Sequence, residues 1–255
     1  MQSPSSKLDT QTILDWFSVS MDNVSTLYGT WGSIFSELQL LVADRGTITH
    51  LIIHSPDQIP IPTSSPILLP DVQFVHLRTH HPLDLLQFVF PPSVVHLGLE
   101  VPGDVKSSSI ESECKNLMRS SPSFSSAASP AGANANSWAF LESISLSLPV
   151  SETILLDITR KFASKAVRVR IVLQATATGD YPEQVVAAFG QVANSGRLGG
   201  ALTWAVAPKC RYLEVRIGQV VAKNRFMHEA MLSQARVAET IRRSQGREFR
   251  INIVM

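Results

Sequence analysis

Hydrophobic and polar residues alternate with a period of two in four short stretches of the first 150 residues, namely 48–54, 72–79, 94–101 and 140–148. Alternation of this kind is typical of a β-strand that buries one face. The same pattern recurs later in the chain, over 167–174, 202–206, 212–219 and 248–254. The alternation therefore predicts a sheet built from many short strands.

Between these stretches the apolar residues are spaced three and four apart, which is typical of helices. Leu27, Trp31 and Ile34 form such a stripe. Pro82 and Pro182 each stand at the start of a helical pattern, where proline is favoured. The helices are expected over 9–43, 82–90, 152–166, 182–194 and 224–244. Because helices and strands alternate, we expect an α/β fold with parallel strands backed by helices.

The chain is expected to divide into an N-terminal helical segment, 1–45, and a repeat-like α/β domain, 46–255. Residues 103–137 interrupt the second part, because eleven of these 35 residues are Ser and most of the others are small or polar. Such a composition buries too little apolar surface to offset the entropy of ordering. We therefore expect a disordered Ser-rich insertion at about 103–137.

Three octets share one pattern: THLIIHSP (49–56), VHLRTHHP (75–82) and VHLGLEVP (95–102). Each places His-Leu at its second and third positions and Pro at its eighth. A fourth octet, ESISLSLP (142–149), keeps the alternation and the proline. If parallel strands stack with these prolines aligned, the Leu side chains enter the core and the histidines form columns on the opposite face. One column then holds His50, His76 and His96, and a second holds His54, His80 and Glu100.

Leu-rich units such as LPDVQFVHL (69–77) and PPSVVHLGL (91–99) recur at 140–146 and 212–216. This pattern resembles the degenerate leucine-rich-repeat region of fungal F-box-like proteins, in which Leu-Pro-x-Leu-x-x-Leu-x-Leu units follow an N-terminal F-box. The resemblance covers roughly residues 45–220, and no F-box is evident before it. It implies an irregular leucine-rich-repeat-like solenoid and a role in substrate recognition within an F-box-type ubiquitin ligase.

Repeat solenoids bind partners on the exposed face of a parallel sheet, so we expect a protein–protein interaction module. The residues expected to contact the partner are His50, His54, His76, Arg78, His80, His96 and Glu100. The alternative is a metal-binding or hydrolytic α/β protein that uses the histidine cluster at 50–96, because neutral imidazole is the commonest transition-metal ligand. In that case, two histidines on adjacent strands and Glu100 could supply three ligands.

Signatures of common enzymes do not occur in the sequence. It contains no G-x-S-x-G elbow, no G-x-x-x-x-G-K-S/T phosphate loop, no H-E-x-x-H and no G-x-G-x-x-G. We therefore assign no catalytic residue, no metal ligand and no cofactor, and we do not expect an enzyme.

The net charge of +1 conceals two unlike halves. Residues 1–150 carry 6 Lys/Arg against 13 Asp/Glu (net −7), and residues 151–255 carry 16 against 8 (net +8). We expect the halves to complement each other within one fold, and nucleic acid is not an expected partner. No apolar run of about 18 residues and no secretory leader is present, which favours an intracellular protein, cytoplasmic or nuclear, with no membrane partner.

Overall fold

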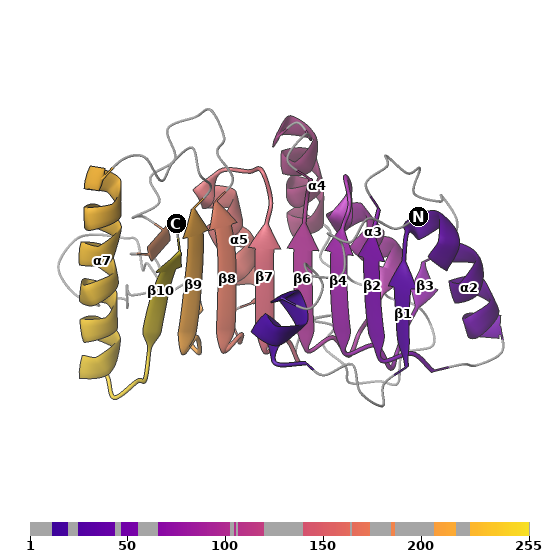
Figure 1. The fold of residues 1–255 in the computed structure, drawn as a ribbon, viewed down its shortest axis with the longest axis horizontal. Helices are drawn as coiled ribbons and strands as arrows, with labels where there is room; N and C mark the ends of the chain where they lie inside the picture. The colour runs from indigo at the N-terminus through magenta and orange to yellow at the C-terminus, as the bar shows by residue number, and fades with distance from the viewer. Residues whose placement is uncertain are drawn as a thin grey trace.

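The computed structural model describes residues 12–19, 25–43, 47–55, 66–102, 105, 107–119, 140–163, 165–173, 185–186, 207–217 and 225–254. Its main feature is a sheet of eight strands in the order β1-β2-β4-β6-β7-β8-β9-β10 (Figure 1). All neighbouring strands are parallel. The strands are β1 (Thr26–Gly29), β2 (His50–His54), β4 (Phe74–Arg78), β6 (His96–Glu100), β7 (Ser143–Ser147), β8 (Arg168–Leu173), β9 (Tyr212–Ile217) and β10 (Arg250–Val254). Strands therefore join this sheet in chain order.

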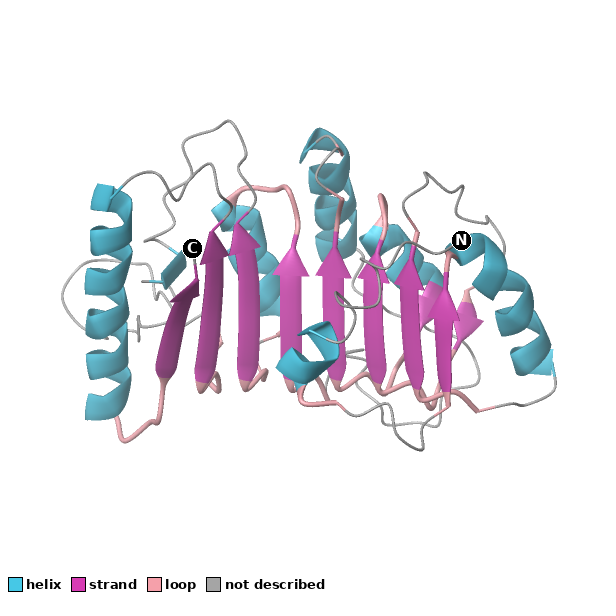
Figure 2. Ribbon diagram, viewed as in Figure 1, coloured by secondary structure: helices cyan, strands magenta, loops and turns pink. Residues whose placement is uncertain are grey.

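Helices return the chain between parallel strands, and Figure 2 shows the central ones behind one face of the sheet and others beside its two outer edges. They are α2 (Trp31–Ala43), α3 (Pro82–Phe88), α4 (Ser107–Arg119), α5 (Glu152–Phe162) and α7 (Arg225–Ser244). Two short strands, β3 (Ile67–Leu68) and β5 (Val89–Phe90), pair separately beside α3. Of the helices in the described residues, none combines the length and the hydrophobicity that a bilayer span requires.

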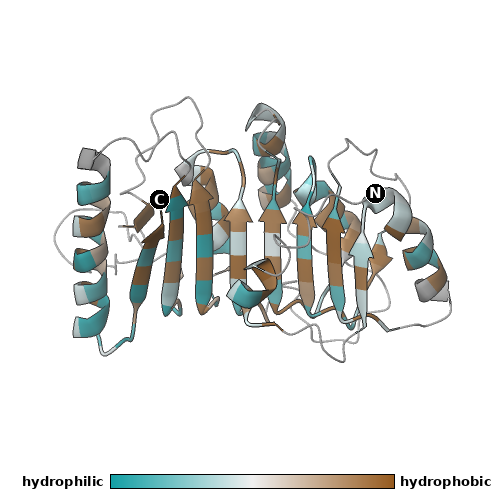
Figure 3. Ribbon diagram, in the orientation of Figure 1, coloured by the Kyte–Doolittle hydropathy of each residue, from teal (hydrophilic) through white to brown (hydrophobic). Residues whose placement is uncertain are grey.

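The hydrophobic core lies between the sheet and these helices. Leu51, Leu97 and Leu146 are buried on the helix-facing side of β2, β6 and β7, and they belong to one hydrophobic cluster that also contains Ile110 of α4 and Ile158 of α5. Full burial of one such side chain stabilises the fold by about 1.5–3 kcal/mol. Figure 3 shows hydrophobic and hydrophilic bands in alternation along the strands. Because hydrophobic and polar residues alternate along each strand, one face of the sheet is hydrophobic and is covered by a layer of helices.

The predicted α/β class, with parallel strands and helices, is confirmed. Two predicted elements fall mostly outside the described residues. These are the strand at 202–206 and the helix at 182–194, of which only 185–186 is described, as helical.

Within 9–43 a short helix and a second helical segment that starts near Leu27 are predicted, and the second prediction is wrong at Thr26–Gly29, which forms strand β1. Leu27 lies opposite Leu51 of β2 and is buried. The spacing of four residues between Leu27 and Trp31 fits a helical stripe. However, pairing with β2 provides hydrogen bonds for the backbone of these four residues, and it also buries Leu27. Residues 12–17 are helical and α2 begins only at Trp31.

The prediction of disorder at about 103–137 is wrong at Ser107–Arg119, which forms α4. Ile110, Cys114 and Leu117 are buried on one side of this helix. Their spacing of four and three is an amphipathic stripe that the serine-rich average over 35 residues concealed. Residues 103–104, 106 and 120–137 lie outside the described part of the chain.

Candidate functional site on the polar face of the sheet

The face of the sheet opposite the core helices carries mostly polar side chains, which the parallel register arranges in three rows. The start row contains His50, Phe74, His96, Ser143, Arg168, Tyr212 and Arg250. The middle row contains Ile52, His76, Gly98, Ser145, Arg170, Glu214 and Asn252. The end row contains His54, Arg78, Glu100, Ser147, Val172, Arg216 and Val254.

The predicted histidine columns are wrong by two residues on β4. His50 lies opposite Phe74, which in turn lies opposite His96, and His76 lies between Ile52 and Gly98. The error arises from aligning Pro82 with the prolines of the other octets. Pro82 is the first residue of helix α3, whereas Pro102 follows strand β6 by two positions.

The second column also differs from the prediction, because Arg78 rather than His80 lies between His54 and Glu100. His80 follows the end of β4 by two positions and is only partly exposed. Arg78 Nε lies 3.3 Å from Glu100 Oε1, so the end row contains an ion pair between adjacent strands. Paired opposite charges of this kind stabilise neighbouring strands modestly.

His76 lies across the backbone of Gly98. A Cβ atom at position 98 would be 2.3 Å from Cδ2 of His76, so only glycine admits the imidazole here. In this position Nδ1 of His76 is 2.9 Å from Nε2 of His54, and Nε2 of His76 is 3.9 Å from Glu100. The register therefore places two histidines and a glutamate in one group, although His50 and His96 are not part of it.

Burial keeps the His76 imidazole neutral. Its side chain is 5% exposed, and this desolvation, followed by the charges of His54, Arg78 and Arg170, lowers its pKa well below 6.5. Burial also lowers the pKa values of His50 and His96. Neutrality at pH 7 is thus favoured for these three imidazoles, and those of His50 and His76 form hydrogen bonds with Thr49 and His54.

The segment 12–19 covers part of the polar face, where it appears in Figure 1 as a short helix in front of β6 and β7. Leu14, Trp16 and Phe17 form a second hydrophobic cluster with Ile52 and Phe74 of the sheet. Phe17 stands edge-on to Phe74, with ring centroids 5.3 Å apart. We expected the whole face to be exposed to solvent, and this cluster shows why part of it is not.

Arginines of β8 hold the same segment from the other side. The guanidinium of Arg170 lies 4.2 Å from the ring centroid of Trp16, and Arg168 donates a hydrogen bond of 2.8 Å to Oγ of Ser18. A cation over an indole ring is worth about 0.5–2 kcal/mol. The polar face therefore binds a helical peptide of the chain itself through aromatic and cation–π contacts.

The seven residues expected to contact a partner differ in their exposure to solvent. His50 and His76 are buried, with 7% and 4% of their surface exposed, whereas His54, His80, Arg78, His96 and Glu100 are partly exposed. The side chain of Arg78 is 38% exposed and that of Glu100 is 27% exposed. Among the predicted residues, the end row therefore offers the most accessible charges.

Arg170, Glu214 and Arg216 form a network on β8 and β9 that the sequence analysis missed. Nε of Arg170 and Nε of Arg216 donate to Oε1 of Glu214 over 2.8 and 2.7 Å, and the Tyr212 hydroxyl donates to Oε2 over 3.2 Å. Burial alone would raise the pKa of Glu214, but the bond from Arg216 and the charge of Arg170 hold it below its usual value. The alternation in RVRIVL and YLEVRI, with charged residues at every second position, was the available signal.

The metal-binding alternative required two histidines on adjacent strands to meet Glu100. The register brings His54, His76 and Glu100 near one another, but it does not bring one ligand atom of each within 4.8 Å of the other two. Within the described residues, one group of three potential ligands approaches closely enough to share an ion, and it lies elsewhere, at His81, Asp84 and Glu113. On the described part of the polar face, His76 bonds to the imidazole of His54 and His50 bonds to the hydroxyl of Thr49.

The fold and this face define an α/β protein with a parallel sheet, covered by helices on one side and polar on the other. Comparison of the chain with protein-family models, with curated proteins and with solved structures gives no match. Arguments about function therefore rest on the architecture and side chains described above.

Proposed function

We propose that this chain is a protein-recognition module whose polar face binds an acidic segment of a partner protein. The observation that carries the proposal is the charge of that face. Its described strand residues include five arginines and two glutamates, which are Arg78, Arg168, Arg170, Arg216, Arg250, Glu100 and Glu214. Ion pairing within the face leaves an excess of positive charge, which favours a negatively charged ligand.

The segment 12–19 supports a polypeptide as the ligand. It shows that aromatic side chains such as Trp16 and Phe17 fit over the start and middle rows between β2 and β8. The end row, with Arg78 and Arg216 about two-fifths exposed, continues beyond this segment. An acidic peptide on the end row would bind two arginines whose planar guanidinium groups suit carboxylates.

The succession of parallel strands in chain order also supports a leucine-rich-repeat-like solenoid, in which the open face of the sheet binds the partner. On this proposal the chain recognises substrates in the context of an F-box-type ubiquitin ligase. The support is that its Leu-rich units resemble those of fungal F-box-like proteins. The F-box itself would have to come from a segment outside these units.

The test is selection of a phage-displayed random peptide library on the purified chain, followed by affinity measurement of the selected peptides. We expect enrichment of Asp and Glu, and affinity at least about tenfold weaker for Arg216→Glu because a charge-assisted hydrogen bond is worth about 1.5–3 kcal/mol. Arg236→Glu, an identical charge reversal at an exposed position of α7, is the matched control and should bind as the parent does.

Three outcomes would overturn the proposal. The first is selection of peptides with no acidic bias, and the second is equal binding by Arg216→Glu and Arg236→Glu. The third is tighter binding of single-stranded RNA or duplex DNA than of any selected peptide, which would make the positive face a nucleic-acid surface.

A further inference from the structure

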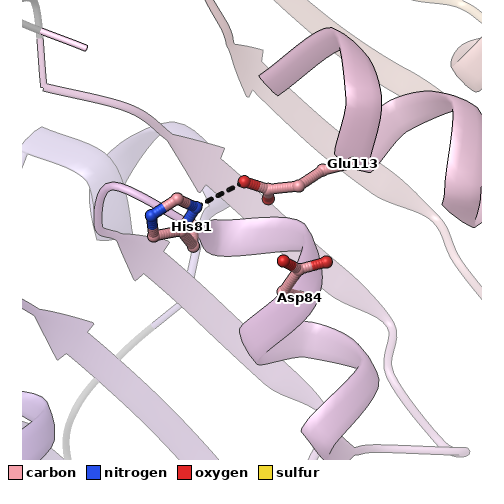
Figure 4. A group of neighbouring side chains, drawn as sticks. All are labelled: His81, Asp84 and Glu113. Carbon is pink, nitrogen blue, oxygen red and sulfur yellow. Dashed lines mark hydrogen bonds and ion pairs between the residues drawn. The ribbon is translucent and has the colours of Figure 1, made fainter. Parts of the chain in front are cut away.

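His81, Asp84 and Glu113 come together away from the polar face, where helices α3 and α4 meet (Figure 4). His81 immediately precedes α3, Asp84 is in the first turn of that helix, and Glu113 extends from α4. One potential ligand atom from each residue lies within 4.8 Å of the others. Nδ1 of His81 is 2.6 Å from Oε1 of Glu113, which fixes the orientation of both side chains.

Glu113 is buried but incompletely satisfied. Only 4% of its surface is exposed, and its second oxygen, Oε2, has no hydrogen-bond partner. In Figure 4 this carboxylate faces both His81 and Asp84. A buried carboxylate oxygen without a partner is costly, and each such atom in a folded protein requires an explanation.

The local charge is also unbalanced. Two carboxylates share one imidazole, and of the described residues no arginine or lysine forms an ion pair with either of them. Lys115, on the same helix as Glu113, lies 3.9 Å from Glu111 instead. Burial raises the pKa of Glu113 and that of Asp84, as expected of carboxylates that lack a sufficient positive charge.

From this geometry we propose that His81, Asp84 and Glu113 bind one divalent transition-metal ion, with Zn²⁺ the best fit. One imidazole nitrogen and two carboxylate oxygens form a donor set that zinc accepts, at about 2.0–2.2 Å per ligand. The ion takes the place of the proton in the hydrogen bond between Nδ1 of His81 and Oε1 of Glu113, which is released to solvent, and it neutralises the two carboxylates. His81 and Asp84 are partly exposed, so the ion has a route from solvent and a position open to water or a further ligand.

The site rests on observations separate from those behind peptide recognition. It would bind α3, which follows β4, to α4, which follows β6, and thus join two successive units of the fold. Its loss should leave the polar face, on the opposite side of the sheet, unaffected. A zinc result and a peptide-binding result can therefore fail independently.

The test is calorimetric titration of the full chain with Zn²⁺ after removal of metals with a chelator. We expect binding of one ion per chain at micromolar or lower dissociation constant, weakened at least about tenfold in Glu113→Gln and in Asp84→Asn. Glu111→Gln is the matched control, since it makes the same substitution on the same helix at a residue outside the cluster, and it should bind within about twofold of the parent. Asp84 is partly exposed, so Asp84→Asn remains informative if Glu113→Gln does not fold.

Weak or no binding by the parent chain would overturn the proposal. Equal binding by the parent, Glu113→Gln and Asp84→Asn would also overturn it, because the ion would then occupy another site. Loss of zinc binding in His54→Gln but not in Asp84→Asn would assign that site to the His54–His76 pair on the sheet.

Discussion

Glu113 and Glu214 are equally buried, each with 4% of its surface exposed, but their surroundings differ. Glu214 accepts hydrogen bonds from two arginines and a tyrosine on the sheet. Glu113 has hydrogen bonds with His81 and with the backbone N–H of Asp84, its Oε2 has no partner, and the carboxylate of Asp84 lies beside it. Accordingly the pKa of Glu214 lies below its usual value of 4.5, whereas burial raises that of Glu113 above it.

The difference separates a completed structural ion network from an incomplete one. Around Glu214 the chain supplies enough positive charge and donors for both carboxylate oxygens, so no external ligand is needed. Around Glu113 a proton or a metal ion must supply what the chain does not. Burial alone therefore does not identify a ligand site, but burial with an unsatisfied oxygen and a charge deficit does.

Replacement of Arg170 by Met should have the largest effect on stability. It leaves Glu214 buried with only the partly exposed Arg216 as an ionic partner, and we expect a loss of roughly 3 kcal/mol in the free energy of unfolding, measured in urea. The matched control is Arg160→Met, which removes an exposed pair with Asp157 and should cost less than about 0.5 kcal/mol. A cost below about 1 kcal/mol for Arg170→Met would show that the network is less important than its geometry indicates.

The second largest expected effect is the increase that zinc causes in the free energy of unfolding, which should differ between Glu113→Gln and Glu214→Gln. At a free concentration of 100 times the dissociation constant, a ligand that binds only the folded chain raises the free energy of unfolding by about 2.7 kcal/mol. We expect this gain in the parent and in Glu214→Gln, and at most about half of it in Glu113→Gln because the variant binds zinc at least about tenfold more weakly. The measurement is urea unfolding with and without the ion, and an equal gain in all three proteins would place the ion elsewhere.

The pH dependence of Glu214→Gln tests the completed network. The carboxylate has a lowered pKa in the folded state, so it contributes stability above pH 4.5, and that contribution is lost as the pH falls through the folded-state pKa. Loss of charged hydrogen bonds should cost about 1.5–3 kcal/mol at pH 7. Unfolding experiments from pH 7 to pH 3 should show the variant and the parent converging, and parallel curves would contradict the assignment.

The smallest effect, with the opposite sign, is expected for Glu113→Gln without metal. Because its folded-state pKa is raised, the parent loses stability as the pH increases from 4.5 through that pKa, and the neutral amide does not. In the presence of a chelator at pH 7.5, the variant should therefore equal the parent or exceed its stability by about 1 kcal/mol. A destabilised variant whose deficit persists at pH 4 would indicate packing, not charge.

The fold was largely predictable because alternation in strands such as His50–His54 directly specifies which side chains are buried. The strand register could not be predicted from the aligned prolines, because Pro102 follows strand β6 by two positions whereas Pro82 begins helix α3. The strand Thr26–Gly29 was missed because four residues with one buried leucine carry too weak a pattern.

The candidate sites show the same limit. The charged alternation in β8 and β9 could have indicated the Arg170–Glu214 network, since both patterns are local. The cluster at Glu113 could not be found in the same way, because it depends on how α3 and α4 pack. Its one local signal was the stripe of Ile110, Cys114 and Leu117, which lay within a segment expected to be disordered.

The most direct test of the central claim, that Glu113 lacks a cation which Glu214 does not need, is anomalous diffraction at the zinc absorption edge from crystals grown with Zn²⁺. The account predicts a peak bounded by His81, Asp84 and Glu113, at about 2.0–2.2 Å from one atom of each, and none at Glu214. A crystal with no zinc peak at this cluster would contradict it, whether the zinc is found at the His54–His76 pair or nowhere in the crystal.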